Sequence, residues 1–535
     1  MIFTKLNSST RLFFVAFGLI IAVIISRWQI WQMGMIEFDE LIWTNVLRLG
    51  YCGVPGVDFE ANTTGFISIW ILGLMRFMGL EFDYFGLRIW GFIVGYLGSM
   101  VMLSFSVKKE ERWLIWVLFT GLWMNSQTAF QTYNTEWLGL FFMSLSFWAF
   151  TQKENWIGDI IIGLLLVILP IVKMQMILFA GLFWMLRLIE ILFGDRVVGL
   201  GNRWWIRLLT TVLVPLVLLV YFNSRDWWDA FVFYYWHKNI FYTKLFSEVG
   251  IVRAILGVAK SQLFLFFSIW LFFIWFGFVN IRQIMGYFKQ QGNHFLEVIN
   301  GKVGIKIGNE IVVFLALITG IVSIVIPRNN FIHYHQLLLI WFALAIFYCI
   351  RFLKSRKMFW FWGVLVCYVG VFNIANGVKA MVSGKGFAFF EIQTSITRNP
   401  EVDSAVDYMR NLNLGVQLAG QVNTVPVLFL GNPLAAILQH DLYPKYRQIF
   451  RCPNILLWEK MWRYSPELWK KEIKYFEEDI WGNKMGMNGR GPLYIIDTEN
   501  IVDLGLIPAF SKRVKKDYRI LKHFGRIAIY EKKIR

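Results

Sequence analysis

Long apolar segments separated by short basic clusters constrain the fold of this chain more than any other feature. Apolar residues make up 57% of the sequence and charged residues only 16%, whereas a soluble globular protein carries about 25% charged residues. The first apolar segment, from Arg11 to Trp31, is long enough to span a bilayer. We therefore expect a polytopic α-helical membrane protein with about 11 transmembrane helices. The expected helices lie near residues 12–33, 86–107, 113–128, 137–151, 157–172, 175–193, 207–222, 262–281, 310–327, 336–350 and 359–378.

The basic clusters orient these expected helices. Lys and Arg gather in the loops between alternate segments, and loops rich in positive charge stay on the cytoplasmic side. The amino terminus carries Lys5 and Arg11 and belongs on that side, so an odd number of crossings leaves the carboxyl terminus outside. The net charge of +18 is then mainly a topology signal, with attraction to anionic lipid as a second interpretation. We expect a multi-pass protein of the plasma membrane and, because the Lys and Arg are dispersed between spans, no nucleic-acid partner.

From about Lys379 the chain changes character, because charge density rises and apolar runs shorten. Segments 425–431, 492–497 and 526–530 predict strands, and 466–478 predicts an amphipathic helix. We therefore expect two domains, a membrane domain over 1–378 and a soluble α/β domain over 379–535 outside the membrane. A first outer loop over 34–85 is expected to contain interfacial helices.

Acidic residues mark the expected outer face. Asp39 and Glu40 follow the first apolar segment, where a carboxylate can accept a proton from an acceptor hydroxyl. Alternatively, Asp39 caps the helix that follows. Asp58 and Glu60 are either solvated loop charges or, together with Asp39 and Glu40, ligands for a divalent cation such as Mg, Mn or Zn. Glu136 stands at the outer mouth of an expected helix, where an ionisable group is functional or lies among the headgroups.

Cationic and aromatic residues accompany these carboxylates. Lys173 follows Pro170 between two apolar segments that leave almost no loop, and a lysine there can hold a phosphate as a point charge. Its alternative role is to anchor the chain at the membrane interface. Arg328, His333 and Tyr334 form a donor-rich patch that suits an anionic headgroup. A zinc site there would need a further ligand that the neighbouring sequence does not supply.

Several common chemistries have no motif in this chain. There is no Walker A loop, no GxGxxG before a helix, no GxSxG elbow and no HExxH helix. The sequence therefore gives no support for nucleotide-driven transport or for the common soluble hydrolase mechanisms, and no motif requires a cofactor.

In this order, the motifs resemble those of the GT-C glycosyltransferases. The similarity is greatest to the bacterial family 39 or ArnT-like group, which is related to protein O-mannosyltransferases. The resemblance covers essentially the whole chain, although Asn62-Thr-Thr64 stands where the family often has Lys-Pro-Pro. The motifs that carry it are Phe38-Asp39-Glu40, Gly56-Val-Asp58-Phe-Glu60, Tyr133-Asn-Thr-Glu136, Val172-Lys173-Met-Gln175 and Phe331-Ile-His333-Tyr334.

The resemblance implies an inverting transfer of a sugar from a polyprenyl-phosphate donor at the outer, periplasmic face of a bacterial membrane. It makes Asp39, beside Glu40, the general base on the acceptor hydroxyl. It gives the donor phosphate to Lys173 and to Arg328 with His333 and Tyr334. It leaves the remaining carboxylates to shape the pocket or hold a cation; these are Asp58, Glu60 and Glu136. The acceptor is a protein, a lipid or a glycan, and a lipid A-modifying aminosugar transferase is a narrower form of the same function.

Two other functions remain open on the sequence. A transporter or flippase of lipid-linked glycans would show paired repeats and charges near the middle of its spans. The sequence shows no repeat, and most charges lie at the ends of the apolar segments, which favours catalysis at the surface. A non-catalytic relative that only binds a lipid-linked sugar is the second alternative.

Overall fold

The computed structural model of the chain has two compact units. The first contains residues 1–29, 90–226 and 243–383, and the second contains residues 30–89, 227–242 and 384–535. The structure describes residues 8–32, 44, 71, 73–81, 83–124, 135–152, 156–195, 204–224, 232–237, 240–241, 308–326, 332–353, 400–412, 425–431, 442, 446–450, 463–481, 492–503 and 507–533.

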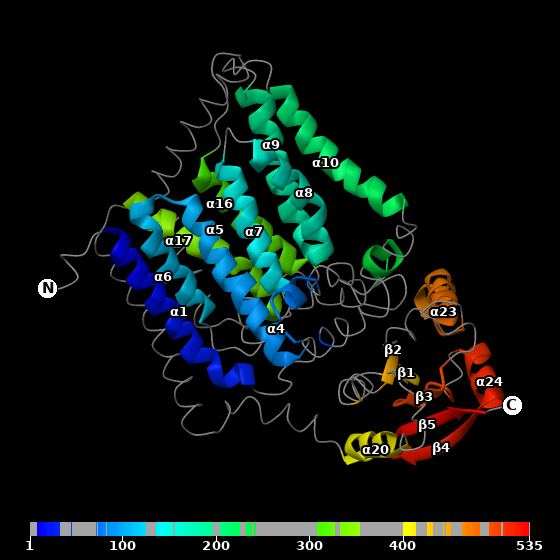
Figure 1. Cartoon of the computed structure of the whole chain (residues 1–535). Helices are drawn as coiled ribbons and strands as arrows, with labels where there is room; N and C mark the ends of the chain where they lie inside the picture. The colour runs from blue at the N-terminus through cyan, green and yellow to red at the C-terminus, as the bar shows by residue number, and fades with distance from the viewer. Residues whose placement is uncertain are drawn as a thin grey trace. The chain divides into compact units, whose positions relative to one another are not determined.

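The first unit is helical where it is described (Figure 1). Shorter 3-10 or π-helical turns begin or end several of its helices. The helices are α1 Ser8–Gln32, α5 Ser99–Ser106, α6 Arg112–Trp123, α7 Thr135–Thr151, α8 Trp156–Val172, α9 Ile177–Ile189, α10 Trp204–Ser224, α16 Asn309–Val325 and α17 Leu339–Leu353. The turns are η3 Gly91–Gly98, η4 Lys109–Glu111, η6 Met174–Met176, η7 Glu190–Asp195 and η10 Ile332–Leu338. Helix α4, Tyr84–Trp90, runs directly into η3.

An aromatic core joins α7, α9 and α17. The ring of Trp341 is fully buried, stacks on Phe179 and Phe183 at centroid distances of 5.8 and 5.6 Å, and meets the edge of Phe147 at 6.1 Å. Aromatic side chains contribute large buried areas and favour such offset or edge contacts. This core fixes α17 beside α7 and α9.

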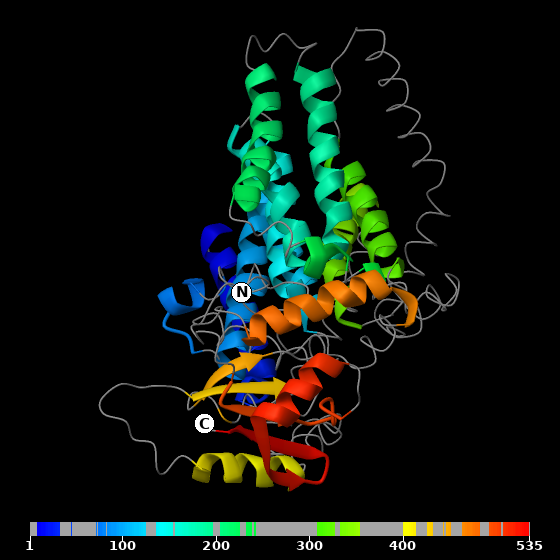
Figure 2. The same ribbon diagram turned by 90° about the vertical axis from the view of Figure 1, so that its right-hand side faces the viewer.

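Helices α8 and α9 form an antiparallel hairpin whose turn is Lys173. Its backbone is extended, with φ −156° and ψ 130°, so the helix cannot continue through it. Asp159 in α8 and Arg187 in α9 lie equally far along the chain from Lys173, and their side chains meet. Helix α10 packs beside α8 (Figure 2). The start of α7 and the Lys173 turn therefore share one end of this bundle, and the end of α7 shares the other end with Asp159 and Arg187.

The expectation of a polytopic protein with about 11 transmembrane helices is wrong. Described helices do lie at the expected positions, but α6 has 12 residues and α8 and α16 have 17 each, whereas a span needs about 20. In the part of the chain that the structure describes, two helical stretches are long and apolar enough to cross a membrane, Tyr84–Ser106 and Met174–Leu192. The expected helices at 262–281 and 359–378 lie outside the described residues.

The reason for this error is visible in α17. From Leu337 to Phe347, every residue but Ala345 is at most 1% exposed, and Ala345 is still buried, at 8%. A helix that is apolar all round is either a membrane span or the core of a protein, and α17 is largely a protein core. Counting apolar runs therefore overestimated the number of spans.

The second unit contains a five-stranded sheet among its described residues, in the order β2-β1-β3-β5-β4. β1 is parallel to β2 and β3, and β5 is antiparallel to β3 and β4. The predicted strands and helix are present as β1, β3, β5 and α23, whereas β2 and β4 were not predicted. The elements are α20 Pro400–Asn411, β1 Val425–Leu430, β2 Tyr446–Phe450, α23 Pro466–Trp481, β3 Tyr494–Asp497, α24 Pro508–Asp517, β4 Tyr518–Phe524 and β5 Ile527–Lys532. A further short turn, η9 Val232–His237, belongs to the same unit.

The core of this unit forms around its central strands. Residues 427–430, 495–497 and 527–530 are buried. Phe476 of α23 meets Phe510 of α24 edge-on at 5.1 Å. The carboxylate of Asp497 is also buried, and it accepts hydrogen bonds from the backbone N–H groups of Glu499 and Val502 at 3.1 and 2.8 Å.

Candidate functional site

Three of the residues selected from the sequence lie together at one end of the helical bundle. Lys173 Nζ lies 2.9 Å from Glu136 Oε1 and 5.0 Å from the centre of the Tyr334 ring. Glu136 is in the first turn of α7, Lys173 is the turn between α8 and α9, and Tyr334 is in η10. We call these three residues the lysine cluster. Its members come from three separate segments, so the fold, not the local sequence, brings them together.

Local structure explains how Lys173 reaches this position. Its N–H donates to the carbonyl of Leu169 at 3.1 Å, and its own carbonyl accepts the N–H of Met176 at 2.9 Å. These bonds close a tight turn that directs the backbone from α8 into α9. On α7, a Cβ at Gly139 would overlap the Met176 side chain, so the glycine lets α7 approach this turn closely.

The burial of the lysine cluster is uneven. The Glu136 side chain is fully buried and Tyr334 is 6% exposed, whereas the Lys173 side chain keeps 15% of its surface accessible. A buried carboxylate needs a cation or hydrogen-bond donors to offset its lost hydration, and the face of an aromatic ring attracts an ammonium group. The arrangement therefore presents a cation, oriented by a carboxylate and a ring, that solvent still reaches.

The other selected residues are not placed in this site. Asp39, Glu40, Asp58, Glu60 and Arg328 lie outside the described residues. His333 lies in η10, where the structure describes its backbone but not its side chain. Within the described ranges, no group of three or more His, Cys, Asp or Glu side chains is arranged to hold a metal ion. The cation alternative for the outer-loop carboxylates therefore stays a prediction.

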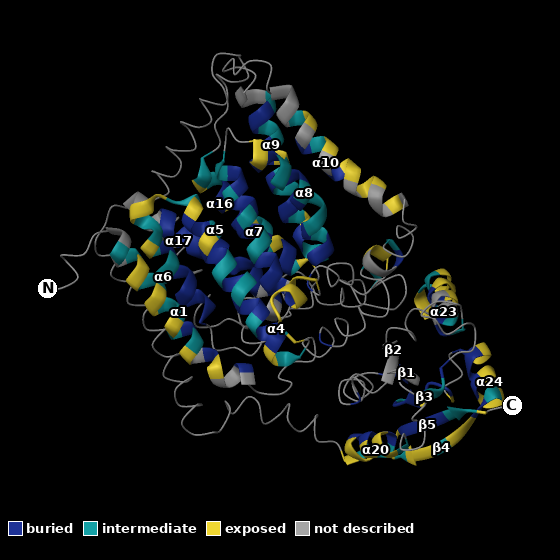
Figure 3. Ribbon diagram, in the orientation of Figure 1, coloured by how far each residue is buried: buried dark blue, intermediate teal, exposed yellow. Residues whose placement is uncertain are grey.

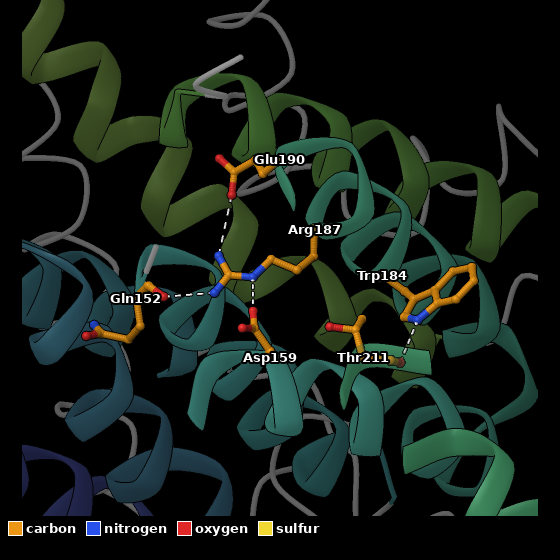
Figure 4. A network of polar contacts seen from close by, with 6 residues as sticks. All are labelled: Gln152, Asp159, Trp184, Arg187, Glu190 and Thr211. Carbon is orange, nitrogen blue, oxygen red and sulfur yellow. Dashed lines mark hydrogen bonds and ion pairs between the residues drawn. The ribbon is translucent and has the colours of Figure 1, made fainter. Parts of the chain in front are cut away.

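A second charged cluster lies at the opposite end of the same helices and was not predicted (Figure 4). Arg187 is fully buried, and its Nε donates to Asp159 Oδ1 at 2.5 Å. One terminal nitrogen lies 3.4 Å from Glu190 Oε2, and the other donates to the carbonyl of Gln152 at 2.8 Å. We call these four residues the guanidinium cluster. A sequence signal did exist, because charges inside apolar helices are costly and need partners.

The guanidinium cluster has a structural role, because it holds three elements together. Its acceptors come from the end of α7, from α8 and from η7, so one side chain connects three elements. A Cβ at Gly158 would lie 2.7 Å from the carbonyl oxygen of Ala149 and 3.2 Å from Arg187, so only glycine permits this approach. Nearby, Trp184 donates to the carbonyl of Thr211 at 3.1 Å and ties α9 to α10. The planar fork of Arg187 is directed at carboxylates and a carbonyl of the chain itself, which leaves this cluster without the features of a binding site.

Aromatic packing holds the backbone next to Glu136. Trp137 contacts Trp123 with ring centres 3.7 Å apart, and a Cβ at Gly95 would lie 3.0 Å from Trp137. Gly95 belongs to η3, a π-helical segment of a kind that is frequent at functional sites. Arg27 of α1 was also missed by the sequence analysis; it is buried and donates to the carbonyl of Trp123 at 2.9 Å. These contacts fix the start of α7, and with it the position of the Glu136 carboxylate.

A scan against protein-family models finds no match for this chain, and searches of curated proteins and of solved structures find no similar protein.

Proposed function

We propose that this chain is an inverting glycosyltransferase that moves a sugar from a polyprenyl-phosphate donor to an acceptor at the outer face of the plasma membrane. The observation that carries the proposal is the lysine cluster. Lys173, which the ordered motifs assign to the donor phosphate, is partly accessible and is held by Glu136 and Tyr334. An ammonium group has three donors, so it can contact a carboxylate and a phosphate at the same time.

In the proposed reaction, the acceptor hydroxyl attacks the anomeric carbon from the face opposite the phosphate. The new bond joins the acceptor oxygen to that carbon, and the bond from the carbon to the phosphate oxygen breaks. Asp39 takes the hydroxyl proton, and the polyprenyl phosphate leaves with the bonding electrons. Lys173, together with Arg328 and Tyr334, stabilises the charge that develops on the leaving phosphate. Glu136 keeps Lys173 in place.

Exposed apolar side chains support the placement of this enzyme at a membrane. On α10, five aliphatic side chains at helical spacing are each about half exposed, and Figure 3 shows the exposed residues along this helix. They are Leu209, Leu213, Leu216, Val217 and Val220, at 49–67% exposure. Phe13 and Phe17 on α1 are also exposed, at 63% and 52%. Exposed apolar stripes of this size are unusual on soluble monomers, and hydrocarbon, either lipid or a polyprenyl tail, suits them.

The test is transfer of labelled sugar from a panel of polyprenyl-phosphate monosaccharides, with the full chain in membranes. We expect turnover with one donor, and a fall of about 100-fold or more in Lys173→Gln, as for loss of one donor to a developing oxyanion. Asp39→Asn should abolish transfer. The matched control is Lys109→Gln, which neutralises an exposed lysine of η4 in the same unit. The proposal would be contradicted if the folded protein transferred sugar from none of the donors. Full activity in both Lys173→Gln and Asp39→Asn would contradict it as well.

A further inference from the structure

A strongly basic surface covers the last elements of the second unit. Residues 508–533 contain nine Lys or Arg but only two acidic residues, Asp517 and Glu531. Seven of these cations are exposed on α24, on β4 and in the turn that follows β4; they are Lys512, Arg513, Lys515, Lys516, Arg519, Lys522 and Arg526. We call this surface the basic face. It lies in the part of the chain after Lys379 where charge density rises, and folding exposes its cations on successive elements.

The folding of this segment explains why the charges point outward. Helix α24 buries Phe510, Ser511 and Val514, so the residues between them face solvent. β4 lies at the edge of the sheet and pairs only with β5 among the described strands. Charged residues on an edge strand ordinarily prevent pairing with other chains, so exposure alone does not indicate a partner.

Some of the cations are neutralised within the unit. Arg519 forms an ion pair with Glu531 at 2.6 Å, and Lys515 forms one with Asp503 at 2.7 Å. Arg513 lies 4.1 Å from the centre of the Trp481 ring. Four others have no acidic side chain within ion-pair distance in the described part of the chain; these are Lys512, Lys516, Lys522 and Arg526. The backbone N–H of Arg526 does donate to Glu401 Oε2 at 3.3 Å. A surface whose four cationic side chains form no ion pair with the described residues is suited to an external anion.

An exposed aliphatic side chain distinguishes the kind of anion. Ile520 is 53% exposed and lies in β4 between Arg519 and Lys522. Surfaces that bind single-stranded nucleic acid expose aromatic rings on which bases stack, whereas Tyr518 and Tyr530 are buried here. Cations that surround an aliphatic residue are typical of a surface that rests on lipid headgroups.

We propose that the basic face docks on the phosphate headgroups of an anionic lipid bilayer. The inference rests on the membrane placement argued under the proposed function, but it assigns a role to the second unit that the transfer reaction does not require. Each Lys or Arg close to an anionic membrane strengthens attachment by roughly fivefold. Lys512, Lys516, Lys522 and Arg526, whose side chains form no ion pair with the described residues, can together hold this unit against a membrane at moderate salt.

The experiment compares hydrogen exchange of the full chain in nanodiscs of neutral phosphatidylcholine with exchange in nanodiscs that also contain phosphatidylglycerol. We expect amides of α24 and β4 to exchange several-fold more slowly with phosphatidylglycerol, and high salt to remove the difference because it screens exposed charge. The test variant changes Lys512, Lys516, Lys522 and Arg526 to Gln. The matched control removes the same charge elsewhere in the unit by changing Arg410, Arg463, Lys470 and Lys474 to Gln.

The lipid effect should vanish in the test variant and persist in the matched control. An equal response to both lipid compositions, or an effect that survives in the test variant, would overturn the proposal. So would protection of these amides by an oligonucleotide together with no effect of phosphatidylglycerol. A chain that stays soluble without detergent would instead contradict the membrane placement, and flotation with vesicles of the same two compositions would then test the basic face directly. None of these readouts depends on sugar transfer, so the two proposals fail separately.

Discussion

The two ends of the α7–α8–α9 bundle stabilise their buried carboxylates in different ways. Both bury carboxylates beside a cation, but Arg187 is fully buried and meets three acceptors of the chain, whereas Lys173 is partly accessible and lies against Glu136 and a ring. The guanidinium cluster closes its end of the bundle. The lysine cluster leaves a cation within reach of solvent. Burial of charge therefore does not identify a functional site by itself, and the accessibility of the cation is what separates the two clusters.

The largest expected difference between the two ends is in stability. Arg187→Gln leaves one amide where a guanidinium joined three acceptors, so buried carboxylates lose their cation, and we expect a loss of about 3–5 kcal/mol. Lys173→Gln keeps a donor beside Glu136 at a site that water reaches, and we expect a loss of about 1–2 kcal/mol. Thermal unfolding of the detergent-solubilised chain measures both.

Transfer activity provides the control for this comparison. Lys173→Gln should lose activity far beyond its loss of stability, and Arg187→Gln should lose activity only as the folded fraction falls. Equal losses of stability, with activity that follows stability in both variants, would make both clusters structural. That outcome would remove the main support for the proposed function.

A smaller effect is expected from the glycines that allow each end to pack. In Gly158→Ala the new methyl group meets the backbone carbonyl of Ala149, which cannot move without shifting a helix, and we expect a loss of about 1–3 kcal/mol. In Gly139→Ala it meets the flexible tip of Met176, which adapts, and the loss should be below about 1 kcal/mol. Unfolding temperatures of the two variants, measured side by side, test this order. The reverse order would mean that the Lys173 turn is the more rigid end.

The sequence identified one of these ends and missed the other for a physical reason. Glu136, Lys173 and Tyr334 stand at the boundaries of apolar segments, where a charged or polar residue is easily noticed. Asp159 and Arg187 lie inside apolar helices, where each looks like an interruption of a span until the hairpin brings them together. That pairing depends on the turn at Lys173 and on Gly158, which no periodicity reveals.

The fold as a whole was likewise only partly predictable from the sequence. Apolar periodicity located the helices, but it could not tell α17, which is largely a protein core, from a membrane span. In the second unit, the apolar strands β1 and β3 were predicted because they are buried. The edge strand β4 was not, because its exposed positions carry Arg519, Lys522 and His523. Strands that face solvent lack the apolar signal on which such predictions depend.

A pH-dependent effect is expected from another buried carboxylate, Asp497, which is held by backbone N–H groups and forms no ion pair with the residues that the structure describes. Burial raises the pKa of Asp497 above its ordinary value of 3.8, and the hydrogen bonds from Val502 and Glu499 oppose that shift. A raised pKa in the folded state means that the folded chain binds the proton more tightly than the unfolded chain. The stabilisation is therefore complete below pH 3.8 and is lost as pH rises through the folded-state pKa.

Asp497→Asn removes this titration, so the wild type should gain stability relative to the variant as pH falls from about 7 to about 4. We expect this gain to appear as slower hydrogen exchange in β1 and β3 of the wild type at the lower pH. If the pH dependence is the same in wild type and variant, Asp497 does not titrate there, and the backbone N–H groups hold its charge as effectively as a cation would.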